Sequence, residues 1–128
     1  MADDTRLRWL RILLIVFGVT FIIGIYPLSM MWPSGWSWGR GHSHYLMMIL
    51  GLYATLGVFL LLAARDPRRH ASIIWFTVWS SVVHALIMAW QAMGDASERG
   101  HLLGDVPVLL VVAVALAALM PRGVGARA

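Results

Sequence analysis

Residues 72–93 read SIIWFTVWSSVVHALIMAWQAM, and this run contains no Asp, Glu, Lys or Arg. The hydrocarbon core of a bilayer is about 30 Å thick, and a helix needs roughly 20 mostly apolar residues to cross it. Lipid offers no hydrogen bonds to the backbone, so a segment in the bilayer must satisfy its own polar groups as a helix. The run therefore predicts a transmembrane helix that ends near Gly94.

The polar side chains of this run gather on one face. At about 100° per residue, every polar side chain between positions 77 and 91 falls within an arc of roughly 100°. These side chains are Thr77, Ser80, Ser81, His84 and Gln91. The opposite face carries Trp75, Trp79, Leu86 and Trp90. We expect the polar stripe to point into a bundle or toward a protein partner, and the tryptophans to face lipid or a neighbouring subunit.

His84 lies near the middle of the run, where a charged side chain is costly. We therefore expect a neutral imidazole that is hydrogen-bonded, with Ser80 as a possible partner on the same face. Two interpretations of the stripe remain open. In one, His84 and its neighbours bind a cofactor, with His84 as an axial ligand of haem or a chlorin, or as part of a quinone or proton site. In the other, the stripe only joins helices by hydrogen bonds.

The composition of the whole chain has the same character. Of 128 residues, 60% are hydrophobic and 12% are charged, whereas soluble domains average about 45–50% apolar and about 25% charged residues. A single domain of this size cannot bury so much apolar surface in water. We expect one integral membrane domain over residues 1–128 and no soluble enzyme. The absence of cysteine excludes thiol chemistry, and no nucleophile, P-loop or HExxH motif occurs, so we expect no enzyme at all.

Four segments are long and apolar enough to span a bilayer, at about 7–26, 45–64, 72–93 and 102–120. We expect Pro27 to end the first and Pro121 to end the fourth. Short connections favour antiparallel neighbours. The fold class predicted is all-α, a four-transmembrane-helix bundle that runs up-down-up-down.

Arginine accounts for all ten basic residues, and its distribution predicts the orientation. Eight arginines flank one side of the predicted spans, namely Arg6, Arg8, Arg11, Arg65, Arg68, Arg69, Arg122 and Arg127. Only Arg40 and Arg99 fall on the other side. We expect a multi-pass protein of the bacterial inner membrane with both termini in the cytoplasm. Because the arginines follow the span ends, we expect no nucleic-acid partner.

The predicted outer side carries histidines and methionines. His42 and His44 lie in the long loop at 27–44, and His101 emerges on the same side. Thioethers at Met30, Met31, Met47 and Met48 suit Cu(I), so a metal site at His42, His44 and His101 is one hypothesis. Solvated histidines at the membrane interface are the alternative, since no fixed metal-binding spacing occurs.

Three charged residues near the fourth span are assigned structural roles. Asp105 precedes Val106-Pro107, a pattern typical of a helix N-cap. Arg99 and His101 are possible charge partners for Asp105. Glu98 and Arg99 are expected to hold the outer loop in place.

Three stretches of the chain resemble DUF6632, a family of small bacterial integral membrane proteins of unknown function. They are YATLGVFLLLAARDP at 53–67, WFTVWSSVVHA at 75–85 and ERGHLLGDVP at 98–107. The resemblance implies four membrane helices and draws attention to the Trp-Ser-Ser-x-x-His run. It implies no activity.

Three functional hypotheses follow. The first is a non-enzymatic accessory or structural subunit that packs against another membrane protein or against its own copies. The second is a membrane protein that binds haem, chlorin or quinone through His84. The third is a small transporter or copper-handling protein that uses His42 and His44.

Overall fold

The computed structural model describes residues 2–37 and 44–121. Within these residues the structure is helical and contains no strand. The elements are α1 (Asp3–Val19), η1 (Thr20–Gly24), α2 (Ile25–Met31), α3 (Pro33–Trp36), α4 (His44–Ala63), α5 (Ala71–Gly94), η2 (Ala96–Leu102) and α6 (Asp105–Leu119). The element η1 is a π-helical turn, and η2 is a 3₁₀-helix.

Within residues 2–37 and 44–121, four helical segments are long and apolar enough to cross a membrane. They are Asp3–Met31, His44–Ala63, Ala71–Gly94 and Ala96–Leu119. Their outer faces expose large apolar side chains, such as Trp90 at 76% and Val114 at 68%. An apolar surface of this extent needs an apolar environment, so these findings indicate a membrane protein.

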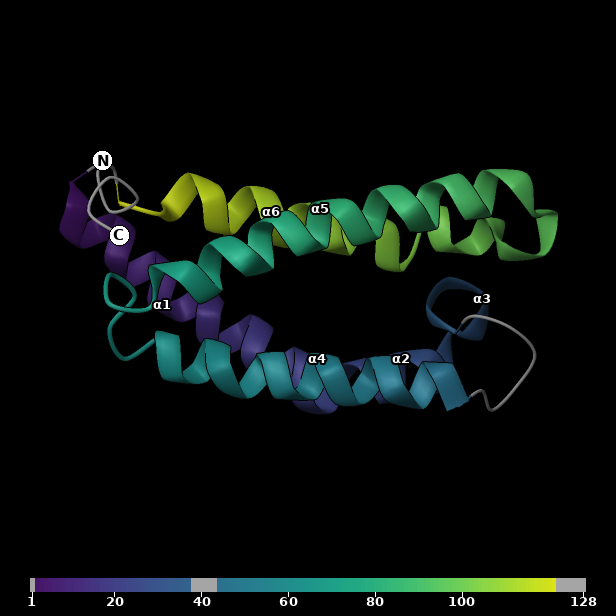
Figure 1. The fold of residues 1–128 in the computed structure, drawn as a ribbon, viewed down its shortest axis with the longest axis horizontal. Helices are drawn as coiled ribbons and strands as arrows, with labels where there is room; N and C mark the ends of the chain where they lie inside the picture. Colours follow the sequence, from purple (N-terminus) through teal and green to yellow (C-terminus); the bar gives the residue numbers. More distant parts are fainter. Residues whose placement is uncertain (1, 38–43, 122–128) are drawn as a thin grey trace.

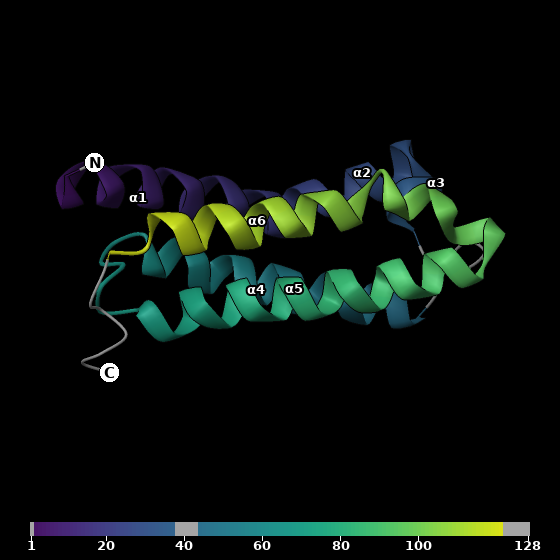
Figure 2. The same cartoon turned by 90° about the horizontal axis from the view of Figure 1, so that it is seen from above.

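The bundle consists of two helix pairs. Helix α5 packs along α6, and α1 packs along α4. The pairs form the two layers of Figure 1, in which the start of α1, the α4–α5 turn and the end of α6 lie at one end of the bundle. Figure 2 shows the whole bundle from above, with the same three segments together at one end. The larger core cluster joins both pairs around Leu10, Leu60, Ile74 and Leu116, each 0% exposed.

The expectation that Pro27 ends the first helix is wrong, because the helix continues to Met31. The π-helical turn η1 ends at Gly24, three residues before the proline, and the Ile25 N–H donates to the Thr20 carbonyl, five residues back. Proline has no N–H to donate, and its ring crowds the carbonyl group four residues earlier. A wider helical turn before the proline relieves this steric clash. The helix therefore passes the proline instead of stopping at it.

Two glycines allow α1 and α4 to touch. A Cβ on Gly57 would lie 2.5 Å from the Gly18 carbonyl oxygen, and one on Gly18 would lie 2.8 Å from the Gly57 oxygen. Only residues without a side chain permit backbones to approach so closely. This contact fixes the point where α1 and α4 cross, just before η1 in the sequence.

The segment before α6 differs from the predicted span at 102–120. Residues 96–102 form η2, and α6 begins only at Asp105. The short helix α3 packs on η2. A Cβ on Gly104 would collide with the Gly35 carbonyl, and one on Gly100 with the Ser34 carbonyl. These two glycines let α3 fold over the end of the bundle and bring Trp36 inward.

Candidate functional site

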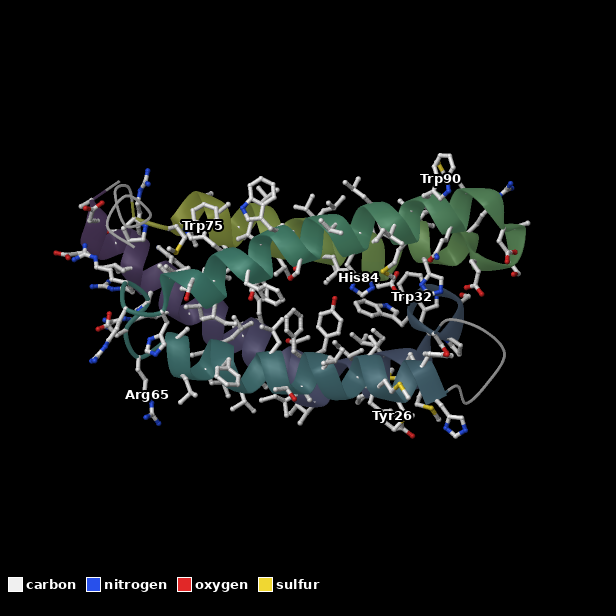
Figure 3. The ribbon with its side chains drawn as sticks, in the orientation of Figure 1. Tyr26, Trp32, Arg65, Trp75, His84 and Trp90 are labelled. Carbon is white, nitrogen blue, oxygen red and sulfur yellow. The ribbon has the colours of Figure 1, made fainter. Side chains whose placement is uncertain are left out.

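The polar stripe of α5 faces the bundle along most of its length. Thr77 is 0% and Ser81 is 2% exposed, and Ser80 and His84 are half-buried, whereas Gln91 is exposed. Figure 3 shows His84 pointing from α5 toward α4, while Trp90 points away from the bundle. The expected inward face is therefore found for four of the five residues, and Gln91 is the exception.

His84 bonds to a tyrosine of the neighbouring pair. The Tyr53 hydroxyl of α4 lies 2.6 Å from His84 Nδ1. Ser80, considered as the partner of His84, instead donates to the Thr77 carbonyl of its own helix, at 3.4 Å. With Tyr53 donating to Nδ1, a neutral imidazole carries its proton on Nε2 and offers a second donor there.

A cavity of about 80 Å³ lies beside this pair. Its walls are mainly apolar and come from η1, α4, α5 and α6, with Ile25 from α2 and Trp36 from α3. Its polar lining residues are Thr20, Trp36, Tyr53, His84 and Asp105. Ile49 and Val108 also line it, and each is 39% exposed, so the cavity reaches the outer, apolar surface of the bundle. An apolar cavity with a few convergent polar groups is the usual form of a small-molecule site.

Trp36 contributes an unused hydrogen-bond donor. Its indole Nε1 is buried and has no partner within the described part of the chain. A buried N–H without an acceptor costs about 1–3 kcal/mol. A bound molecule with an acceptor atom would remove this cost.

A second polar cluster adjoins the cavity through Asp105. His101 is 0% exposed, and its Nδ1 lies 2.9 Å from both carboxylate oxygens of Asp105. Its Nε2 lies 3.1 Å from the Ser37 carbonyl oxygen and 3.1 Å from Glu98 Oε2. The imidazole is thus held between two carboxylates at the same end of the bundle as the cavity.

The expected N-cap role of Asp105 is wrong. Gly104 occupies the cap position of α6 without a side-chain hydrogen bond, and Asp105 is the first helical residue. Its carboxylate binds His101, which was one of the two charge partners expected for it. The positive end of the helix dipole also favours a negative charge in this first turn. Glu98 bonds to the same imidazole, and Arg99 is exposed on η2.

The three histidines of the hypothetical metal site occupy different surroundings. His42 lies outside the described residues. His44 is exposed at the start of α4, and His101 is buried against Asp105. Across residues 2–37 and 44–121, no group of three or more His, Asp or Glu side chains is placed to hold a metal ion. The copper site stays a prediction.

The size of the cavity bears on the cofactors considered for His84. A cavity that encloses benzene measures about 150 Å³, so the far larger macrocycle of haem or a chlorin does not fit beside His84 in this conformation. The cavity of about 80 Å³ is also smaller than the benzene cavity, so it has room for only part of a six-membered ring, with the remainder on the apolar surface. Among the considered cofactors, the ring edge of a quinone meets this description.

Tyr53 and Trp36 are the site residues that the sequence analysis missed. A tyrosine inside an apolar run is itself a signal, because its hydroxyl needs a buried partner. Trp36 carries no comparable signal, since its position depends on the folding of α3 onto η2.

Comparison with known proteins gives one match. Residues 4–127 match the DUF6632 family, described as a family of unknown function. No curated protein and no solved structure shows detectable similarity to the chain. Because the match extends over nearly the whole chain, this protein belongs to the DUF6632 family.

Proposed function

We propose that this protein is a multi-pass inner-membrane protein of a bacterium that binds a small lipophilic molecule of the quinone class in the cavity beside Tyr53 and His84. The observation that carries the proposal is the buried indole N–H of Trp36, which has no partner among the described residues and belongs to a residue lining that cavity. The protein acts as a binding protein and not as an enzyme.

The chemistry of the lining suits both forms of a quinone. The carbonyl oxygen of a quinone accepts hydrogen bonds, and Trp36 Nε1 and His84 Nε2 are donors. A hydroquinone hydroxyl donates, and the Asp105 carboxylate accepts. The partly exposed apolar lining residues Ile49 and Val108 suit a ligand that arrives from the bilayer with an apolar tail.

The proposed orientation puts both termini in the cytoplasm, with the four helices running up-down-up-down. Its support is the arginine distribution, since Arg8, Arg11, Arg65, Arg68 and Arg69 are all exposed near one end of the bundle. Arg99 is exposed in the connection at the opposite end. This asymmetry follows the positive-inside rule, and it assigns the cavity to the outer half of the membrane.

The test is calorimetric titration of decylubiquinone into the full chain in nanodiscs of uncharged phospholipid. We expect saturable binding to the wild-type protein. Trp36→Phe removes the indole N–H and should weaken binding about tenfold, the equivalent of about 1.4 kcal/mol. Trp79→Phe is the matched control, because Trp79 is 64% exposed on the outer face of α5.

Two results would overturn the proposal. One is the absence of saturable binding above that of empty nanodiscs. The other is an equal affinity for the Trp36→Phe and Trp79→Phe proteins, which would show that the quinone dissolves in lipid or binds elsewhere.

A second candidate function is that of an accessory or structural subunit, in contact with another membrane protein or with a second copy. The exposed indoles of Trp79 and Trp90 on the outer face of α5 favour it, because large aromatic side chains are enriched at interfaces. Co-purification after mild extraction tests this role. A partner that is retained by the wild-type protein and lost from a Trp79→Ala, Trp90→Ala double variant would support it.

A further inference from the structure

We propose that Glu98, His101 and Asp105 form a proton relay between the outer water and the cavity. The three side chains are in series. Glu98 reaches His101 Nε2, and Asp105 reaches His101 Nδ1. Asp105 also lines the cavity that contains Tyr53 and His84. The side chain of Glu98 is 17% exposed and that of His101 is fully buried, so the series runs from the surface inward.

The acceptors around His101 show where the cluster holds protons. The Ser37 carbonyl can only accept, so the Nε2 that faces it carries a hydrogen. Nδ1 faces both oxygens of Asp105, and this contact needs one further proton on either the nitrogen or the carboxylate. The cluster thus holds a transferable proton, either as imidazolium beside carboxylate or as neutral imidazole beside carboxylic acid.

Inward transfer proceeds by proton steps alone. From the imidazolium form, the Nδ1–H bond breaks and an O–H bond forms on Asp105, which leaves a neutral ring with its hydrogen on Nε2. Asp105 releases this proton into the cavity. A half-turn of the neutral imidazole then brings the unprotonated ring nitrogen toward Glu98, which takes a proton from water and passes it to that nitrogen, so that the imidazolium forms again. One proton moves in each cycle, and no electron is transferred.

At the cavity, the relay ends beside other groups that accept and donate protons. Asp105 interacts electrostatically with Tyr53, and both line the same cavity. At roughly 10–15 Å³ for each water, the cavity has room for water beside its polar groups, which include Asp105, Tyr53 and His84. Proton transfer along such a chain of donors and acceptors needs only small movements of each group.

The elements around His101 supply few other charged groups. Helix α3 has none, η2 adds Arg99, and α6 adds only Asp105 in the described residues. Asp95 at the start of η2 is engaged by Ser97. Glu98 and Asp105 are therefore the acidic groups in contact with the ring.

The relay deepens the proposed function, since it brings exchangeable protons to the side chains that would hydrogen-bond the bound quinone. The role of the relay depends on the proposed quinone binding, but the test of the relay uses protein without quinone. Failure of the relay is thus distinguishable from failure of quinone binding.

The experiment measures the exchange of the His84 ring proton with water, by nuclear magnetic resonance of protein labelled with ¹⁵N-histidine in detergent micelles. We expect Glu98→Gln and Asp105→Asn each to slow this exchange by about a hundredfold, the size of effect typical of a positioned proton-transferring group. Asp66→Asn, in the α4–α5 turn at the opposite end, is the control and should leave the rate unchanged.

The same spectra report on His101 directly. We expect the ring nitrogen of His101 that faces the Ser37 carbonyl to carry hydrogen in the wild-type protein. An unchanged His84 exchange rate in Glu98→Gln protein, which keeps the shape of the side chain, would overturn the relay. A His101 ring whose Nε2 carries no hydrogen would overturn it as well.

Discussion

The Tyr53 hydroxyl lies 2.6 Å from His84 Nδ1, and this bond joins the α1–α4 pair to the α5–α6 pair at the edge of the cavity. A hydrogen bond between membrane helices contributes about 0.6 kcal/mol on average and up to about 1.7 kcal/mol. The same two side chains that stabilise the bundle thus face the proposed ligand. Their structural and binding roles can be separated by experiment.

The first prediction concerns the energy of this bond. Tyr53→Phe and His84→Ala should each lower the free energy of unfolding, and the double variant should lose less than the sum, with a coupling of about 0.5–1.5 kcal/mol. A double-mutant cycle on the protein in mixed micelles measures it. Thr55→Val is the control, since the Thr55 hydroxyl bonds within its own helix, to the Gly51 carbonyl. Strictly additive losses would show that the two side chains do not interact.

The second prediction concerns the crossing of α1 and α4. Gly57→Ala places a methyl group 2.5 Å from the Gly18 oxygen and 2.9 Å from Ile22 Cγ1. The helices must separate, at a cost of about 1–3 kcal/mol in unfolding free energy. Gly51→Ala on the same helix is the matched control, because its Cβ would meet nothing within 4 Å. Equal stability of the two variants, measured by denaturant titration in micelles, would contradict the close crossing.

The third prediction concerns the cover over the cavity. Gly104→Ala directs a methyl group at the Gly35 carbonyl and should displace α3, and with it Trp36, from the bundle end. We expect increased quenching of tryptophan fluorescence by iodide and loss of decylubiquinone binding. Gly94→Ala is the control, since nothing lies within 4 Å of its added Cβ. Unchanged quenching in the Gly104→Ala protein would show that α3 does not rest on this glycine.

The fourth prediction concerns Asp95, between α5 and η2. The Ser97 hydroxyl and then the Ser97 backbone N–H hold the pKa of Asp95 below its ordinary value. Because the pKa of Asp95 is lower in the folded state than in the unfolded state, its hydrogen bonds to Ser97 stabilise the fold at pH values above the unfolded-state pKa. This stabilisation is lost as the pH falls through the folded-state pKa. Ser97→Ala should raise the pKa of Asp95, as followed by the ¹³C shift of its carboxyl carbon. Ser97→Thr keeps the hydroxyl and should retain the low pKa; equal pKa values in both variants would contradict this cause.

Much of the fold follows from local pattern. The apolar runs predict four spanning segments, and the structure has four helices of that kind. The polar arc on α5 predicts its inward face, because helical periodicity is set by the backbone alone. Pro27 was misleading, because its effect depends on whether the preceding turn can widen, and nothing local in the sequence signals η1.

The site is less predictable than the fold. His84 stands out as an ionisable residue within a span, but its partner Tyr53 is 31 positions away, and only the packing of α4 against α5 brings them together. His101 and Asp105 are close in sequence, so their contact was among those considered. The position of Trp36 depends on backbone contacts at Gly100 and Gly104, which become visible only when the chain is folded.

The most direct test of the proposed quinone site is to locate a bound quinone. A photoreactive azido-quinone is cross-linked to the full chain in nanodiscs, and mass spectrometry identifies the labelled residues. We predict labelling at the residues Trp36, Tyr53 or His84 themselves, and its loss when excess decylubiquinone competes. Labelling that spreads over the lipid-facing residues Trp79 and Trp90 and resists competition would contradict a quinone site in this cavity.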